Sequence, residues 1–472
     1  MRSVRRGDYS SGLSPFSKLF ASPRRVVTVG LMIGSFMGSM EATVVATAMP
    51  TIVGQMGGLS IYGWAFSIYV LASSAGIPLA GKLSDILGRR LVYAWAMGLF
   101  LTASLLCAVA PSMIWLIVFR GLQGLGAAGL LPLALVMIGD MFSFEERARV
   151  QGLFSAVWGL SSVVGPLLGG FLVDRVGWPS VFYINIPFGF LSAYLVWHWW
   201  KDTHGLTEGK PYIDYPGAVL VSLAAVALLL GLVDLSVWYG WALVGLSGVL
   251  SYALWRVEKA SPDPVLPLPL FHGRLFTITV LHALVIGWTL NGVTAYVPLF
   301  VQEVQKKSAT EAGATLTPML LAWVISSVIC AKLMLRVGYR GPAIGGMVSV
   351  VIGSILMGLL EPASGKLLLL GSMAILGAGL GFTVPALLIA VQMMVERRSM
   401  GAATATIQFA RSIGGSLGVG VMGAFLNFRL AHVGVAGALQ TTFIVAGAVS
   451  ILGLALTIAA PKLSAEEMGR KR

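Results

Sequence analysis

Charged side chains are scarce in this sequence of 472 residues. Only 11% of the residues are Asp, Glu, Lys or Arg, whereas 57% are apolar and the mean hydropathy is +0.86. Soluble chains usually have about a quarter of their residues charged, so this chain lacks the polar surface that a water-soluble protein needs. The shortage of charge excludes a soluble globule and indicates an integral membrane protein built from helices.

Cysteine is also scarce, and signatures of enzymes are missing. Cys107 and Cys330 each lie in an apolar run, which argues against a disulfide framework or a metal cluster. Residues 124–129 match a dinucleotide-binding fingerprint, but no strand precedes them. Residues 76–82 match most of a phosphate loop, but Leu83 stands where Ser or Thr must bind magnesium. We therefore expect no enzymatic activity, no cofactor and no metal.

Long apolar runs fill most of the chain. A run of about 20 apolar residues can cross the roughly 30 Å hydrocarbon layer as a helix, and turns or charged segments separate fourteen such runs. They lie approximately at residues 26–47, 61–81, 91–110, 112–137, 150–172, 179–200, 216–235, 238–256, 274–301, 312–335, 341–360, 367–394, 402–428 and 438–460. We expect an all-helical membrane protein with fourteen transmembrane helices.

The positive charge gathers on one side of these runs. The chain has 32 Lys and Arg and a net charge of +13; of the 32, 25 fall in termini and loops of one side, 5 on the other side and 2 inside runs. Lys and Arg concentrate in cytoplasmic loops, so we expect both termini in the cytoplasm. The charge then reflects orientation and contacts with membrane lipids, and we expect no binding to nucleic acid.

A weak internal repeat divides the chain into halves. At an offset of 250 residues, segment 81–90 aligns with segment 331–340, and Gly165 aligns with Gly415. Parallel halves are a recurrent construction of transporters, so two six-helix bundles with two extra helices between them are expected. The predicted domains are a cytoplasmic segment (1–25), a first six-helix bundle (26–200), a linker with two extra transmembrane helices (201–273), a second six-helix bundle (274–460) and a cytoplasmic tail (461–472).

Two charged residues, Glu41 and Arg120, lie deep inside predicted helices. Each is 9 residues from a proline, Pro50 and Pro111. If both prolines mark the same membrane surface, both charges lie roughly 13–14 Å deep, at about 1.5 Å per residue. A charge at that depth costs about 2.5–3.5 kcal/mol and usually faces a cavity or a partner. We expect the two side chains to meet and to couple to protons, while a permanent ion pair that only fixes packing remains an alternative.

Further polar residues on predicted helices are candidates for substrate contact. They are Gln123, Trp288, Asn291, Tyr296, Gln408 and Arg411. Several lie three residues apart on one helix and therefore share a face. An apolar pocket with a few placed polar groups suits a lipophilic ligand. For each of them, ordinary helix packing is the alternative to substrate contact. Gln123 has a further possible role, which is to hold the guanidinium of Arg120.

Other polar residues have simpler explanations. Asp140 lies near the end of a run, where water would solvate it. His282 occurs singly and is expected to be a packing histidine. Trp64 and Tyr69 are candidates for substrate contact and equally for anchors at the membrane interface.

Several motifs, taken in order, resemble those of the major facilitator superfamily, specifically its fourteen-helix drug:proton antiporter family. The matching segments are residues 40–50, with Glu41 where that family usually has Asp, and 81–90, 120–126, 159–170, 183–187 and 213–217. The resemblance covers essentially residues 26–460. It implies a proton-coupled antiporter that exports hydrophobic or cationic drugs by alternating access. Its partners would be protons and a lipophilic small molecule. Apart from the resemblance, we expect a monomer, and the short chain and the lack of a glycosylation sequon suggest the bacterial inner membrane.

The resemblance also implies residues that gate the conformational change. They are Gly81, Asp85, Gly88, Arg89 and Arg90 in the loop expected after the second helix, and Gly165, Pro166, Gly169 and Gly170 in the fifth helix. In the family, the first set clamps the two halves in one conformation, and here Asp85 and Arg89 are expected one helical turn apart. The second set permits close helix approach. A basic loop that only sets orientation and a simple packing seam are the alternatives.

Two other functions stay open. An exporter of an endogenous lipid or amphiphile would use the same fold, and drug-independent loss of fitness on deletion would identify it. A non-transporting membrane receptor or scaffold belongs to a different class. The first-half motifs and Glu41 weigh against the receptor, as does the absence of a large soluble domain.

Overall fold

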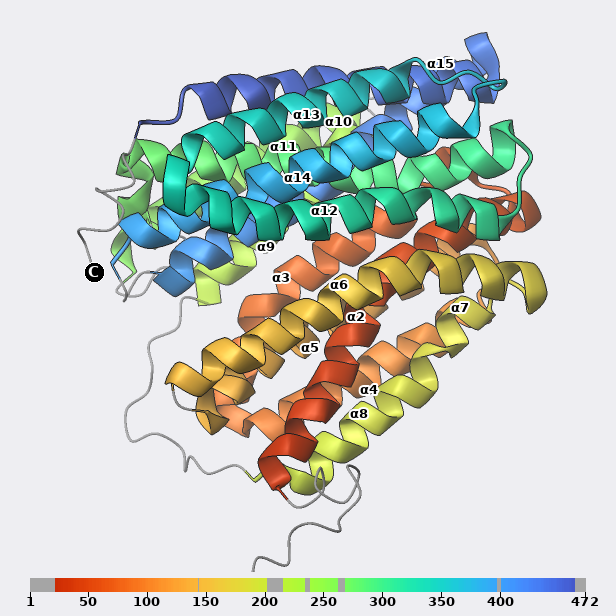
Figure 1. Cartoon of the computed structure of the whole chain (residues 1–472). Coiled ribbons are helices and arrows are strands. Elements are labelled where there is room, and N and C mark those ends of the chain that lie inside the picture. Colours follow the sequence, from red (N-terminus) through yellow and green to blue (C-terminus); the bar gives the residue numbers. More distant parts are fainter. Residues whose placement is uncertain are drawn as a thin grey trace, which may run out of the picture.

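Long helices make up nearly all of the structure (Figure 1). The computed structural model describes residues 22–142, 144–201, 215–233, 238–261, 268–396 and 400–462. The helices are α2 (Pro23–Met56), α3 (Trp64–Leu87), α4 (Arg89–Ala108), α5 (Met113–Met141), α6 (Phe144–Arg175), α7 (Ser180–Tyr183), α8 (Asn185–Trp199), α9 (Tyr215–Val233), α10 (Trp238–Ala260), α11 (Arg274–Leu299), α12 (Ala309–Val337), α13 (Arg340–Gly358), α14 (Lys366–Met394) and α15 (Met400–Ile458), with short turns η1 (Leu59–Ile61), η2 (Leu268–His272) and η3 (Phe300–Val304). Within these described ranges, eleven helical stretches are long and apolar enough to cross a membrane.

The sequence explains both the helices and their exposed apolar surface. In lipid every backbone N–H and C=O must find its partner within the protein, and a helix satisfies them internally. Large apolar side chains such as Trp95, Phe190 and Leu367 are exposed, as expected for a surface that faces lipid. Local signals set some ends: α2 begins at Pro23, and Ser308 and Glu311 form a capping box at the start of α12.

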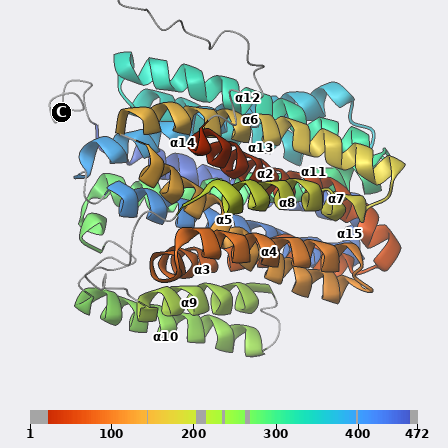
Figure 2. The same cartoon turned by 90° about the horizontal axis from the view of Figure 1, so that it is seen from below.

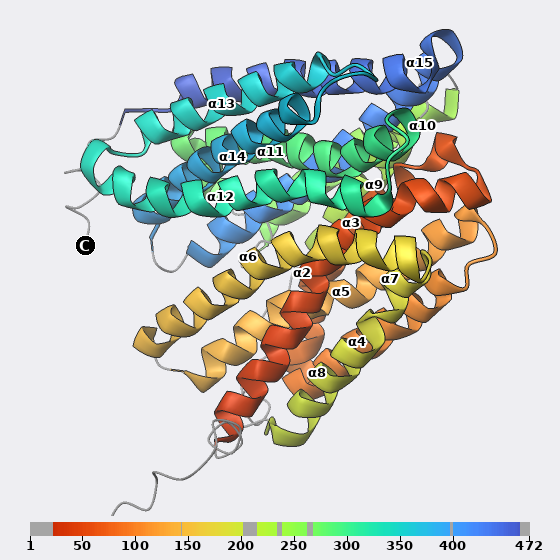
Figure 3. The ribbon, with the colours of Figure 1, turned by 45° about the vertical axis from the view of Figure 1, so that its right-hand side comes forward.

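The helices form two groups that lie against each other. The first contains α2–α6 and α8, and the second contains α11–α15. Within the first group α2 packs against α6 and α8; within the second, α11 packs against α15, and α14 packs against α12 and α13. Figures 1 and 3 show that the groups meet at the end where α2 ends and spread apart toward the end where α2 begins. We call the first of these the closed end.

Two helices, α9 and α10, lie outside both groups. They pack against each other, and α9 also contacts α3 and α15. Figure 2 shows the pair along the outer side of α3. Because α3 belongs to the first group and α15 to the second, α9 covers one seam between them.

The connection between α3 and α4 differs from the expected loop. α3 continues to Leu87, and a single residue, Gly88, separates it from α4. Gly88 has a φ of 90°, which glycine adopts without steric cost. Gly81 and Asp85 therefore lie in the last turns of α3, whereas Arg89 begins α4. The expectation that Asp85 and Arg89 are one turn apart in a loop is wrong.

The last two predicted helices are joined at one residue. α15 is helical throughout except at Gly434, whose φ is 69°. Gly414 packs against Leu284 and Gly453 against Val285, so positions on both sides of Gly434 reach the same level of α11. The chain therefore turns back at Gly434, and the expected connection of several residues between 428 and 438 is wrong.

Candidate functional site

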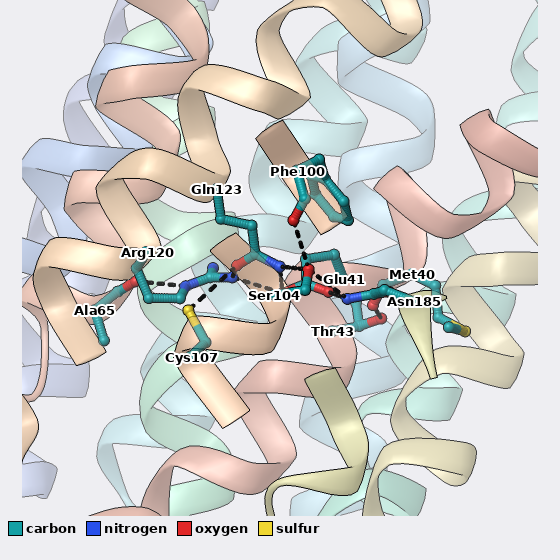
Figure 4. A network of polar contacts seen from close by, with 10 residues as sticks. All are labelled: Met40, Glu41, Thr43, Ala65, Phe100, Ser104, Cys107, Arg120, Gln123 and Asn185. Carbon is teal, nitrogen blue, oxygen red and sulfur yellow. Dashed lines mark hydrogen bonds and ion pairs between the residues drawn. The ribbon is translucent and has the colours of Figure 1, made fainter. Parts of the chain in front are cut away.

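Glu41 of α2 and Arg120 of α5 form a buried ion pair (Figure 4). Arg120 Nη1 lies 2.6 Å from Glu41 Oε1, and the two side chains are 1% and 0% exposed, respectively. The contact agrees with the equal depths predicted from Pro50 and Pro111. Because water solvates neither charge, each depends on the other and on further hydrogen bonds.

Arg120 has three further contacts. Its Nε donates to the backbone oxygen of Ala65 at 3.1 Å, and its Nη1 donates to Gln123 Oε1 at 2.6 Å. Its guanidinium lies 4.1 Å from the ring centroid of Tyr69, a favourable cation–π distance. Tyr69 is buried beneath this cation, so the expectation that it anchors the chain at the membrane interface is wrong.

Glu41 accepts hydrogen bonds on both carboxylate oxygens. Gln123 Nε2 donates to Oε1 at 2.9 Å, and Asn185 Nδ2 of α8 donates to Oε2 at 2.7 Å. Gln123 Nε2 also donates to Ser104 Oγ of α4 at 2.8 Å. Gln123 is fully buried within this network, so of its two predicted roles the structure favours holding the guanidinium.

Glycines in α5 allow the network to form. A Cβ at Gly124 would lie 2.4 Å from the backbone oxygen of Tyr69, and one at Gly126 would lie 2.5 Å from the backbone nitrogen of Phe100. Both distances are far inside van der Waals contact, so α5 approaches α3 and α4 more closely than larger residues permit. This close approach explains the glycine spacing of residues 120–126, which belongs to packing inside a helix.

A small cavity lies between the two helix groups, beside the guanidinium of Arg120. The first group contributes Ala42, Phe66, Ser67, Tyr69, Val70 and Arg120, and the second contributes Asn291, Thr294, Ala295, Gly415, Ser416 and Val419. The wall is mostly apolar, with a few hydroxyl and amide groups and one guanidinium. Such a lining suits a lipophilic ligand that carries a polar or charged group.

The predicted substrate residues of the second group scatter. Among the described residues, Asn291 is the only one of the predicted set that lines this cavity. Tyr296 is fully buried and donates to the backbone oxygen of Val419 at 2.8 Å. Trp288 and Arg411 are partly buried, and Gln408 is exposed. Tyr296 is therefore a packing residue in this conformation.

The predicted gating residues of α4 contact neighbours in their own group. Arg89 Nε lies 2.5 Å from Asp140 Oδ2 at the end of α5, and the Arg90 guanidinium lies 4.2 Å from the ring of Trp197 in α8. Asp140 remains accessible to water, as expected near the end of a run, and also pairs with Arg89. The side chain of Asp85 lies outside the described residues.

The small residues of α6 lie at two close helix contacts. A Cβ at Gly165 would lie 2.2 Å from Thr43 Oγ1 of α2, and one at Gly169 would lie 2.5 Å from Thr47 Oγ1. On the other side, a Cβ at Gly170 would lie 2.4 Å from the backbone oxygen of Ala309 at the start of α12. The backbone oxygen of Pro166 approaches Gly313 of α12 equally closely. These residues therefore bring the two groups together at the closed end.

Asp174 fastens the closed end. Its Oδ1 accepts from the Ala309 backbone N–H at 3.1 Å; its Oδ2 accepts from the Thr310 backbone N–H at 2.9 Å and from Thr310 Oγ1 at 2.5 Å. The free N–H groups of a helix N-terminus stabilise a carboxylate. Asp174 belongs to α6 and Ala309 begins α12, so this carboxylate joins the first group to the second.

We expect Asp174→Ala to open the closed end more often. Loss of a carboxylate cap costs about 1–2 kcal/mol, equivalent to a roughly 5- to 30-fold population shift. Spin labels on Val176→Cys and Glu361→Cys would measure the distance across this end. Glu311→Gln is the control, since Glu311 caps Ser308 within its own turn. An unchanged distance distribution for Asp174→Ala would show that the carboxylate does not hold the two groups together.

Asn185 and Ser104 belong to the site but were not predicted. Each is a polar side chain within an apolar run, and such groups must find partners in a membrane. Asn185 lies in the segment 183–187, to which no role was assigned from the sequence. His282 matches its expected packing role, because it is buried and its Nε2 lies 2.9 Å from Thr383 Oγ1.

Comparisons with known proteins agree with this architecture. The family model described as "Major Facilitator Superfamily" matches residues 31–419. The multidrug transporter protein MdtP of Bacillus subtilis is 38% identical over 86% of this chain and 76% of its own. Multidrug resistance protein 3 of the same organism is 36% identical over 84% of this chain and 79% of its own. The efflux pump aunC of Aspergillus niger is 32% identical over 84% of this chain and 78% of its own.

Solved structures of low sequence identity share the fold. A D-xylose–proton symporter superimposes with a TM-score of 0.68 at 14% identity, covering 93% of this chain and 98% of its own. An inward-facing bacterial homolog of the human lysosomal transporter Spinster superimposes with a TM-score of 0.69 at 16% identity, covering 95% of this chain and 98% of its own. The chain therefore belongs to the major facilitator superfamily of multi-pass membrane transporters.

Proposed function

We propose that the protein is a proton-coupled antiporter that exports hydrophobic or cationic drugs by alternating access. One observation carries the proposal: Arg120, which holds the buried carboxylate of Glu41, lines the cavity between the two helix groups. An acid that is shielded from lipid and adjacent to a binding cavity can exchange a proton for cargo. The names of the relatives, multidrug transporters and efflux pumps, support drugs as the cargo.

In this scheme the two groups are the two six-helix domains and rock about the central cavity. With the Asp174 end closed, the cavity would open toward the spread end and take up cargo. Glu41 would release its proton there and pair with Arg120. After the reverse motion, Glu41 would take a proton from the outside as cargo leaves. Gly81, Asp85, Gly88, Arg89 and Arg90 would clamp the spread end once it closes.

The membrane arrangement is part of the same proposal. α15 contributes two crossings and α9 and α10 two more, which together with the remaining long helices makes fourteen, as in the fourteen-helix branch of the superfamily. Both termini would then lie in the cytoplasm, with a monomer in the bacterial inner membrane and lipids around it. The excess of Lys and Arg in the segments of one side supports this orientation.

Transport by the purified protein in liposomes tests the function. With an imposed pH gradient, we expect a fluorescent lipophilic cation such as ethidium to move against its own gradient as protons move the other way. A protonophore should abolish the accumulation. Accumulation that survives the protonophore would refute proton coupling. Exchange of a labelled lipid without any response to the cation would favour the lipid exporter.

A further inference from the structure

Asn185 occupies a special place beside the ion pair. It is the first residue of α8 and follows Ile184, whose helical φ and ψ of −61° and −25° carry the chain from α7 into α8 almost without a bend. Pro187 lacks an N–H, so the helix gives up one backbone hydrogen bond just beyond Asn185. The Asn185 side chain is fully buried and points to Glu41 from the side opposite Arg120 (Figure 4).

The two oxygens of Glu41 have different surroundings. Oε1 receives the guanidinium of Arg120 at 2.6 Å and the amide of Gln123 at 2.9 Å. Among the described residues, Oε2 receives one donor, Asn185 Nδ2 at 2.7 Å. A proton is repelled from an oxygen that faces a cation. The proton would therefore add to Oε2, the atom that Asn185 contacts.

A protonated Oε2 needs an acceptor where it now has a donor. Asn185 carries both kinds of group, because its amide has two donor hydrogens and an acceptor oxygen. Asn185 Oδ1 is buried and has no hydrogen-bond partner among the described residues. A half-turn of the amide about its Cβ–Cγ bond would place Oδ1 against the new O–H group.

We propose that Asn185 is the positioning residue for the transported proton: its amide donates to Glu41 Oε2 in the ionised state and turns to accept from Oε2–H in the protonated state. The inference rests on the proposed role of Glu41 in proton coupling. In both states one end of the Asn185 amide stays unpartnered. Because a hydrogen bond to a carboxylate is about twice as strong as a neutral one, Asn185 favours the ionised state and so promotes proton release.

The other ionisable groups around Glu41 are few. They are Arg120 of α5, Tyr69 of α3 and Cys107 of α4. None of these three side chains carries an amide, which has a donor NH2 and an acceptor oxygen in one planar group. Two polar neighbours do not ionise. Gln123 is also an amide, but it contacts Oε1 and not Oε2. Ser104 lies 3.4 Å from Asn185 Nδ2 and donates to the backbone oxygen of Phe100. Asn185 is therefore the neighbour suited to either state of Oε2.

Infrared spectroscopy of the reconstituted protein tests this directly. The C=O band of protonated Glu41 is identified by its loss in Glu41→Gln and is followed as a function of pH. In Asn185→Leu, which lacks both donor and acceptor, we expect the midpoint to move to higher pH by about one unit, because the variant loses a strong hydrogen bond to the ionised carboxylate and a weaker one to the protonated carboxyl. The midpoint of proton-driven transport should move with it.

Two further variants keep the test decisive. Asn185→Asp preserves the size and shape of the side chain, so it remains informative if Asn185→Leu fails to fold. Its two adjacent carboxyls should share a proton and keep it at a pH where the parent has lost it. Ser192→Ala is the matched control. Ser192 lies in α8 and donates to the backbone oxygen of Gly30 in α2, away from Glu41, so its removal should leave the midpoint in place.

The outcomes separate the inference from the proposed function. A parent in which no band titrates, or in which transport does not respond to protons, contradicts the role of Glu41 itself. A parent that titrates together with Asn185→Leu and Asn185→Asp variants whose midpoints match the parent contradicts the inference alone. In that case Asn185 would only connect α8 to α2.

Discussion

Glu41→Gln is expected to abolish proton-driven accumulation of cargo while exchange of cargo for cargo continues. In one-for-one exchange, a gradient of about two pH units supports up to about a hundredfold cargo gradient, because each unit equals 1.36 kcal/mol. The variant should lose this gradient completely. Proteoliposomes that carry a pH-sensitive dye and a fluorescent lipophilic cation measure both fluxes. Exchange of labelled for unlabelled cargo, which needs no net proton movement, shows that the variant is folded.

The expected result follows from the contacts of the carboxylate. A glutamine has the same length and can still accept from Arg120 Nη1 through its carbonyl oxygen, but its amide cannot take up a proton. Its NH2 group would meet Asn185, whose unpartnered Oδ1 can turn to accept from it. The variant should therefore keep the packing of α2, α5 and α8 and lose only the proton.

Glu41→Asp is the matched control for this prediction. It retains an acid one methylene shorter, and the resembling family usually has Asp at this position, so proton coupling should persist. Proton release from Glu41→Gln that equalled that of the parent would contradict the assignment. The acid that carries the proton would then have to lie elsewhere in the chain.

Most of the fold could be predicted from the length and order of the apolar runs. A run that matches the membrane thickness forms a helix, because only a helix satisfies its backbone groups internally. Each predicted run overlaps an observed helix, although several helix ends differ by six to nine residues. The errors fall at connections, where one glycine replaces an expected loop. The chain has 58 glycines, and among the described ones only six have a positive φ. Gly88 belongs to the 81–90 motif, but the motif did not show that this one residue joins two helices, and nothing in the sequence distinguishes Gly434 from the other glycines.

The sequence predicted how deep Glu41 and Arg120 lie in the membrane, but it did not predict toward which neighbours the side chains of the site point. The distances along the chain from Pro50 and Pro111 gave equal depths for Glu41 and Arg120, and depth sufficed because both were the rare charges in their helices. Direction around a helix axis depends on packing that a single sequence does not reveal. Asn185 was missed for that reason. Tyr296 was placed in the substrate set for the same reason, although it packs against Val419.

One helix, α2, connects the proton site to the closed end. Glu41 lies in its middle, and the backbone oxygen of Thr47 accepts from Gln302 Nε2 of η3 at 2.9 Å. One turn further, Thr51 Oγ1 donates to Gln302 Oε1 at 2.9 Å. Gln302 belongs to the second group. A movement of α2 on protonation of Glu41 would therefore change the contact between the two groups. A packed helix that contacts both sites is the kind of element through which the two sites can be coupled.

Arg120→Met is expected to destabilise the protein by roughly 3–5 kcal/mol, because it leaves Glu41 as an uncompensated buried charge. A lower midpoint of thermal unfolding in detergent, at a fixed scan rate, measures the effect. The loss should be smaller at pH 5 than at pH 8, because an unpaired buried carboxylate is relieved when it takes up a proton. Proton-driven transport should stop, since Glu41 then has no cation to stabilise its ionised form.

Two further variants separate the charge of Arg120 from its shape. Arg120→Lys keeps the charge but loses the planar group that donates to Ala65 and stacks on Tyr69, so it should retain part of the stability. The double variant Glu41→Gln with Arg120→Met removes both charges and should recover much of the loss while transport stays absent. Recovery of stability without transport means that the pair serves the transport cycle. A stable Arg120→Met that still exchanged protons for cargo would make the pair a packing element, and the proton would need another route through the cavity.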